Sequence, residues 1–175
     1  MEGKRYMDVM PWTSLLFQSI PEEIILVTLG LALVGKYPRM RGIVTTGIIV
    51  AVFSFFFRRL PLGFGIHTLS GIAVMALTMH LVLRLDLWRG LMAAFLSLVA
   101  LGLVESITIP AMIFLTGIPF ERAVSDPWRR ILFPLPEEII LALAAYILRR
   151  RRISLLPKDE PRLGLTGRKY KEGNK

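Results

Sequence analysis

The stretch LPLGFGIHTLSGIAVMALTMHLVL, residues 60–83, decides the fold class. It holds 24 residues, and its only titratable side chains are His67 and His80. A second stretch, residues 42–57, runs for 16 residues without an ionisable group. A helix needs about 20 apolar residues to cross the hydrocarbon core of a bilayer. These two stretches therefore predict membrane-spanning helices.

The composition of the whole chain agrees with that prediction. Of 175 residues, 54% are hydrophobic and 20% are charged, with a mean hydropathy of +0.57. A soluble domain of this size has too little interior to bury so much apolar surface. Amphipathic soluble helices would also show polar residues at every third or fourth position, and these stretches do not. We therefore predict an all-α, polytopic transmembrane helical bundle, a multi-pass protein of the cell membrane whose first partner is the lipid bilayer.

Five spans are predicted, at residues 14–35, 42–57, 64–83, from 90 to about 110, and 131–148. The fourth apolar stretch continues to residue 120, and Pro110 within it lacks an N–H and disturbs a helix. Either one long kinked helix results, or a span is followed by a short re-entrant or interfacial piece at residues 111–116. If the stretch crosses twice, the chain has six spans. Residues 1–13 are expected to be an interfacial segment, residues 14–148 the transmembrane domain, and residues 149–175 a basic, disordered cytoplasmic tail.

The distribution of Lys and Arg predicts the orientation. With the carboxyl end inside, the cytoplasmic segments hold eleven of these residues and the opposite side holds seven, and RRRR at 149–152 carries most of the bias. Cytoplasmic loops are enriched in Lys and Arg, so we expect the carboxyl terminus inside and the amino terminus outside. A double crossing of the fourth stretch would move the amino terminus inside. The net charge of +9 lies at span ends and in the tail, which favours a membrane-surface role and no nucleic-acid partner.

One phrase occurs twice, as FQSIPEEII at residues 17–25 and as FPLPEEII at residues 133–140. An internal repeat of this kind is typical of membrane transport folds that arose by duplication. The first and fifth of five alternating spans point the same way. We therefore expect a parallel repeat whose four carboxylates, Glu22, Glu23, Glu137 and Glu138, all lie on the outer side.

Three interpretations of these carboxylates stay open. Pro followed by two Glu fits a plain helix start, where free N–H groups and the helix dipole favour anions. A helix from Glu22 to Gly35, however, would have only 14 residues, or about 21 Å, which is short for a crossing. If the helices begin earlier, at Leu15 and Ile131, the carboxylates lie below the interface. Ionisable groups at that depth face a partner, a cavity or a pathway, or they form structural ion pairs within the bundle.

Other polar residues are expected at the same level. Glu105 lies fifteen residues beyond Gly90 and His67 stands at the start of the third span. Arg58 and Arg59 end the second span on that side and are the candidate counter-charges. The candidate ligand-binding or ion-binding residues are Glu22, Glu23, Glu105, Glu137, Glu138 and His67.

No metal, cofactor or catalytic group is predicted. The chain has no cysteine, and His67 and His80 lie roughly 220° apart around a helix axis, too far to form a metal pair on one face. Paired Glu residues also occur in the EExxxR motif of intramembrane CAAX-type proteases, but neither EEIILV nor EEIILA has an Arg in the required place. The Ser residues lack a nucleophile motif. We therefore expect a protein that is not an enzyme.

The segments RRLPLGFGIHTL, PEEIILVTLGLALVGKYP and DPWRRILFPLPEEIILALAAYILRRR resemble the amino-terminal membrane region of Gram-positive sensor histidine kinases with GHKL-type catalytic domains. The resemblance covers residues 14–150. It implies a multi-span input module that senses a peptide, lipid or envelope signal. Residues 153–175 hold no phospho-accepting His and no ATP-binding domain, so the resemblance implies a separate membrane or cytoplasmic signalling partner.

Three functions follow from these observations. The first is a non-enzymatic sensory or regulatory module that binds a ligand or a membrane partner through the outer polar cluster. The second is a small transporter or ion-coupled carrier subunit that uses the repeated Pro-Glu-Glu pairs. The third is a structural subunit of a larger membrane complex, and a homo-oligomer is compatible with each of the three.

Overall fold

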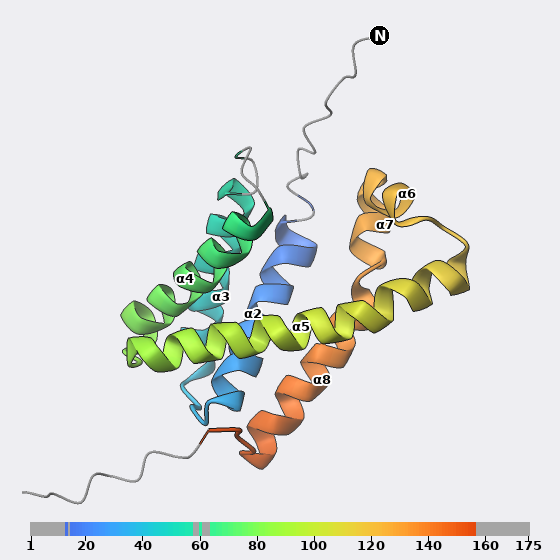
Figure 1. Cartoon of the computed structure of the whole chain (residues 1–175). Helices are drawn as coiled ribbons and strands as arrows, with labels where there is room; N and C mark the ends of the chain where they lie inside the picture. The colour runs from blue at the N-terminus through green and yellow to red at the C-terminus, as the bar shows by residue number, and fades with distance from the viewer. Residues whose placement is uncertain (1–12, 14, 58–59, 61–63, 157–175) are drawn as a thin grey trace, which may run out of the picture.

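A computed structural model describes residue 13 and residues 15–57, 60 and 64–156 of the protein (Figure 1). Every regular element in these ranges is helical, as predicted. The elements are a π-helical turn η1 (Leu15–Ser19) and the α-helices α2 (Ile20–Leu33), α3 (Met40–Phe57), α4 (Phe64–Leu83), α5 (Leu87–Thr116), α6 (Phe120–Ser125), α7 (Pro127–Leu132) and α8 (Leu135–Arg151).

Five helical segments are long and apolar enough to cross a membrane, judged by length and composition. They are Leu15–Leu33, Met40–Phe57, Gly65–Leu83, Leu87–Thr116 and Trp128–Arg151. This number is the predicted one, and it is consistent with a multi-pass membrane protein. The bounds of α4 coincide with the predicted third span, whereas α8 extends to Arg151, three residues beyond the predicted fifth span.

The fourth apolar stretch forms one helix. α5 has 30 residues and continues through Pro110 without interruption, which at 1.5 Å per residue makes it about 45 Å long. The described chain therefore contains neither a second crossing nor a separate re-entrant piece in this stretch. α5 ends where Gly117 adopts a left-handed conformation with φ of 66°, which glycine tolerates because it has no β-carbon. In Figure 1, α5 lies obliquely across α2 and α8.

The predicted fifth span, from Ile131, lies within the candidate span Trp128–Arg151, which consists of two helices. Ile131 belongs to α7, a turn at Phe133 and Pro134 follows, and α8 begins only at Leu135. Two prolines lie close together here, Pro134 and Pro136, and each lacks a backbone donor and clashes with the preceding turn. Pro21 stands alone in the first copy of the phrase, and there α2 follows η1 without an intervening turn.

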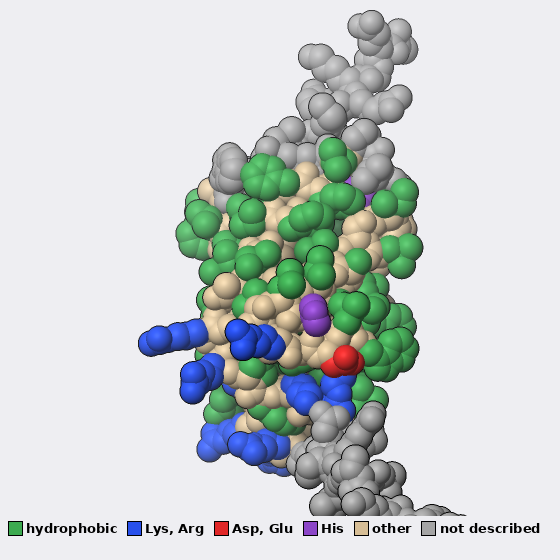
Figure 2. Space-filling view, turned by 90° about the vertical axis from the view of Figure 1, so that its left-hand side faces the viewer, with side chains coloured by type: hydrophobic (Ala, Val, Ile, Leu, Met, Phe, Trp, Pro, Cys, Tyr) green, Lys and Arg blue, Asp and Glu red, His purple; other side chains and the backbone are tan. Residues whose placement is uncertain are grey.

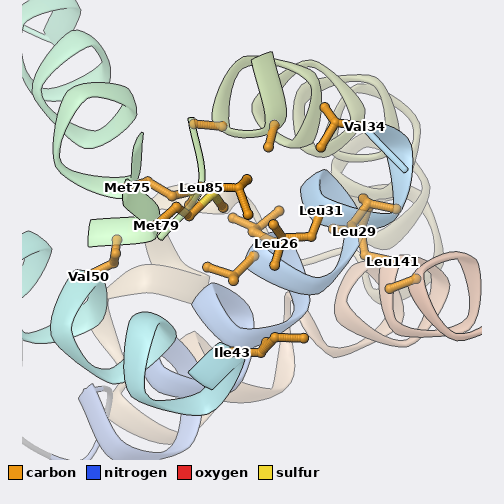
Figure 3. Packing of buried hydrophobic residues seen from close by; sticks show 14 residues of the cluster. Leu26, Leu29, Leu31, Val34, Ile43, Val50, Met75, Met79, Leu85 and Leu141 are labelled. Atoms are coloured by element: carbon orange, nitrogen blue, oxygen red, sulfur yellow. The ribbon is translucent and has the colours of Figure 1, made fainter. Parts of the chain in front are cut away.

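α2 is the central helix of the bundle. All seven residues from Leu26 to Ala32 are buried, and a helix that is apolar all round is one that has neighbours on every side. α3, α5 and α8 pack against it. Figure 3 shows its leucines, among them Leu29 and Leu31, meeting side chains of the other helices in one cluster.

Close approach of the helices depends on small residues. A β-carbon added at Gly30 would overlap the carbonyl oxygen of Ala93 on α5, and one added at Gly47 on α3 would lie 2.6 Å from Ile24 Cγ1. Small residues at such crossings let backbones pack closely, as is usual in helix bundles within membranes.

The end of α8 is bonded to the connection between α2 and α3. Arg149 Nη2 donates to the carbonyl oxygen of Pro38 over 2.7 Å, and the backbone N–H of Leu155 donates to the carbonyl oxygen of Leu33 over 2.8 Å. The residues just after α8 therefore pack against the end of α2. Most of the predicted interfacial segment (1–13) and of the predicted tail, from residue 157 on, lies outside the described residues, as do Arg58 and Arg59.

Candidate ligand-binding cavity

A cavity of about 710 Å³ lies between the amino-terminal halves of α2, α4 and α8, the end of α3, the middle of α5, and α6 and α7. Small-molecule sites usually have volumes of about 300–1,000 Å³. All six residues that the sequence nominated as binding candidates line this cavity: Glu22, Glu23, Glu105, Glu137, Glu138 and His67. The expected convergence of these side chains is therefore found in the structure.

The cavity has a closed floor and an exposed margin. Leu26, Met75 and Ala94 line it and also belong to the buried apolar cluster, so packed side chains close it on the side of the core. Glu105 and Phe120, in contrast, are exposed lining residues. The lining residues are thus exposed at α5 and α6 and buried near the core. The mouth of the cavity therefore lies beside α5 and α6, and its floor lies in the middle of the bundle.

The first Glu pair lies in the first turn of α2, and the π-helical turn η1 directly precedes that helix. Ser19, the last residue of η1, keeps helical dihedral angles, so the helical path runs from η1 into this turn. Both carboxylates are half-buried, and Ser54 Oγ on α3 donates to Glu23 Oε1 over 3.4 Å.

The second Glu pair also stands in the first turn of a helix, and it lies deep in the protein. Glu137 and Glu138 lie in the first turn of α8, which has no side-chain cap, and only 7% and 9% of their surfaces are exposed. Thr108 Oγ1 on α5 donates to Glu137 Oε2 over 3.4 Å. Among the residues that the structure describes, no side chain or backbone group hydrogen-bonds to the carboxylate of Glu138. The two pairs are neighbours, because Glu22 lies within electrostatic range of both Glu137 and Glu138.

Two more polar atoms of the lining are buried without a partner in the described part of the chain. They are Gln18 Oε1 on η1 and His67 Nδ1 on α4. A buried polar atom that lacks a hydrogen bond is unfavourable by about 1–3 kcal/mol. Such atoms at the wall of a cavity therefore favour the entry of water or of a ligand.

Aromatic rings form two parts of the wall. Phe57 stacks on Phe53 with ring centroids 5.2 Å apart, and the ring of His67 meets Phe57 edge-on at 5.4 Å. Phe120 and Phe133 make a second pair at 6.4 Å. Aromatic faces attract cations and also contact apolar ligand surface.

Arg130 on α7 is the cation that lines the cavity in the described residues, and the sequence did not nominate it. It precedes Glu137 by seven residues, a spacing of two helical turns that could have indicated it. The break between α7 and α8 makes that spacing unreliable in this case. His80, by comparison, lies away from the cavity, where its Nδ1 is 2.6 Å from the carbonyl oxygen of Leu85.

In the described residues, no group of three or more His, Cys, Asp or Glu side chains is placed so that it could hold a metal ion. The carboxylates line a space of about 710 Å³. Their chemistry is the acceptance of hydrogen bonds and the attraction of positive charge.

Comparisons with protein-family models, curated proteins and solved structures found no match for this chain.

Proposed function

We propose that this chain is a multi-pass membrane protein that binds a ligand in the cavity and acts as a non-enzymatic sensory or regulatory module. The observation that carries the proposal is the convergence of Glu22, Glu23, Glu105, Glu137, Glu138 and His67 on one space of small-molecule size. Ionisable groups within membrane-spanning helices usually mark a functional site.

The outer surface supports the membrane environment. Large apolar side chains are exposed along the helices, and on α5 they include Ile107, Phe114 and Leu115, with 88% of the surface of Phe114 exposed. Figure 2 shows apolar side chains over the upper part of one face and Lys and Arg side chains gathered toward the lower end. By the positive-inside rule, that basic end, with the carboxyl terminus, is cytoplasmic, and the protein belongs to the plasma membrane.

The position of the cavity favours reception of a ligand from the outer side. In Figure 1, α2 and α8 start at the same end of the bundle and run in the same direction, so both Glu pairs lie toward the end opposite the basic residues. The first turn of α8 holds a Glu pair, and its last turn holds Arg149, which is bonded to Pro38. A ligand bound in the cavity would therefore signal to a cytoplasmic partner through α8, because this helix connects the cavity to the basic end of the bundle.

A carrier is the second candidate, because two Glu pairs on parallel helices face one cavity. The closed floor weighs against it. Leu26, Met75 and Ala94 would have to separate before a solute could pass to the other side. Separation of a close-packed core requires a second conformation of the bundle, whereas binding from one side requires none.

Gentle affinity purification from the native membrane, with mass spectrometry of bound proteins and small molecules, tests the proposal. The wild type and Asp86→Asn should retain a ligand and a stoichiometric partner, and Glu138→Gln should lose the ligand while it remains folded. Asp86 is the matched control, since it is an exposed carboxylate at the other end of the bundle with no side-chain cap bond. A protein that comes out alone and empty, and that mediates Glu-dependent flux in liposomes, would support the carrier instead.

A further inference from the structure

We infer that the ligand of the cavity is a linear aliphatic polyamine, a molecule with two or more ammonium groups joined by short alkyl chains. This inference rests on the proposed function, because it names the ligand class for the same cavity. It follows from three properties of the wall, which are its unsatisfied acceptors, its two Glu pairs and its aromatic surface.

The unsatisfied groups of the wall are acceptors. The carboxylate of Glu138 is 9% exposed and has no hydrogen-bond donor in the described residues, and Gln18 Oε1 is buried and lacks a donor as well. His67 Nδ1 is a third acceptor when the ring proton is on Nε2. A ligand that satisfies these atoms must therefore supply N–H or O–H groups, and an ammonium supplies three together with a positive charge.

The carboxylates form two pairs, one on α2 and one on α8. We call each pair, with the hydroxyl group beside it, a station. Glu22 and Glu23 come from α2, with Ser54 hydrogen-bonded to the second of them. Glu137 and Glu138 come from α8, with Thr108 hydrogen-bonded to the first of them. Each station thus presents a Glu pair beside one hydroxyl group, and both stations open into one cavity. Two acidic stations in one space match a ligand with two cationic ends better than a ligand with one.

Part of the cavity wall is aromatic. Phe53 and Phe57 from α3, and Phe133 from the turn before α8, line the same space. Alkyl chains bury their apolar surface against such rings, and the rings also attract an adjacent ammonium group. A hydrated metal ion would gain little from them, and the described residues form no metal-binding group.

Among the described lining residues, carboxylates outnumber basic side chains. Five carboxylates line the cavity, and the described lining contains Arg130 and His67 as its basic side chains. The attraction is strongest in the deep part, because Glu137 and Glu138 are shielded from water and charges interact more strongly at low dielectric constant. A polyamine that enters past the exposed Glu105 would therefore move toward the α8 station.

The test uses the full chain in nanodiscs of phosphatidylcholine, which has no primary amine, and measures binding of radiolabelled spermidine and putrescine. We expect saturable binding that weakens by at least about tenfold in Glu138→Gln and in Glu22→Gln, since each variant removes one charged acceptor. Asp86→Asn removes the same charge at the far end of the bundle and should bind within about twofold of the wild type. Excess Ca²⁺ or Mn²⁺ should fail to displace the amine.

Four results would overturn the inference. These are the absence of saturable amine binding, equal binding by the wild type and both Glu variants, displacement by the metal ions, and loss of spermidine binding in discs with phosphatidylethanolamine. The last result would identify a lipid headgroup as the source of the ammonium. Gly71 is a cavity position with room for a side chain. Labelling of Gly71→Cys with a charged maleimide distinguishes failure of the polyamine inference from failure of the proposed function. A reactive thiol without amine binding overturns the polyamine alone, and an unreactive thiol without amine binding contradicts both.

Discussion

Thr108 Oγ1 on α5 lies 3.4 Å from Glu137 Oε2 on α8 and 3.0 Å from the carbonyl oxygen of Val104 in its own helix. A hydroxyl group has one proton, so the two acceptors share it and the shorter contact takes the larger part. The bond to Glu137 is therefore the weaker of the two. It nevertheless connects the deepest carboxylates of the cavity to the long helix that crosses the bundle.

Thr108→Val removes this hydroxyl group and keeps the branched shape of the side chain. We expect the free energy of unfolding to fall by about 1 kcal/mol, because Glu137 loses its donor in a buried place. Thermal unfolding in detergent would measure the change. Thr78→Val is the matched control, since Thr78 is equally buried and its hydroxyl group bonds only within its own helix, to Val74. Equal losses in the two variants would mean that the contact with Glu137 contributes nothing.

Much of the fold was predictable because span length and polarity are local properties. The absence of charge over residues 60–83 predicted α4 with its observed bounds, Phe64–Leu83. The depth of Glu105 followed from its distance along the fourth span, and it does line the cavity with the Glu pairs. Depth along a helix can be counted from the sequence, and this is why the candidate site was found.

The remaining features depend on neighbours that the sequence does not reveal. A proline in a long apolar stretch either breaks or only bends a helix, and continuity through Pro110 is decided by packing around α5. Arg130 lines the cavity because α7 ends at Leu132 and the chain turns before α8. Rotation of a side chain toward a cavity is set by tertiary contacts, so neither this residue nor the orphan atom of Gln18 could be predicted.

Gly30→Val should disrupt the centre of the bundle. The added β-carbon would overlap the carbonyl oxygen of Ala93, and a backbone atom cannot move aside as a flexible side chain can. Overpacking of this kind lowers stability by about 1–3 kcal/mol, so we expect less folded protein and a lower Tm. Gly71→Ala is the control, because a β-carbon there meets no atom within 4 Å. A normal Tm for Gly30→Val would show that α2 and α5 separate easily.

Arg149→Met should loosen the bond between the end of α8 and the α2–α3 connection. Its guanidinium group donates to the Pro38 carbonyl oxygen over 2.7 Å, and loss of a charged donor of this kind lowers the free energy of unfolding by about 1.5 kcal/mol. Arg151→Met removes the same charge from the same helix end at an exposed position, and we expect a change within about 0.5 kcal/mol. Chemical unfolding curves of the two variants test the difference. If both lose stability equally, net charge at this end matters and the bond to Pro38 does not.

Gly71→Cys should react with a charged, membrane-impermeant maleimide added from the side opposite the carboxyl terminus. The chain has no native cysteine, and Gly71 lines the cavity with open space beside it. The thiolate is the reactive form, so labelling requires contact with water.

Gly102→Cys is the matched control, because Gly102 also has open space but does not line the cavity and lies on the exposed face of α5. In lipid, that thiol should remain unlabelled from both sides. Labelling of Gly71→Cys only from the side of the carboxyl terminus would contradict the placement of the cavity mouth at the opposite end of the bundle. Equal labelling from both sides would mean that the floor formed by Leu26, Met75 and Ala94 opens, which is the behaviour that a carrier requires.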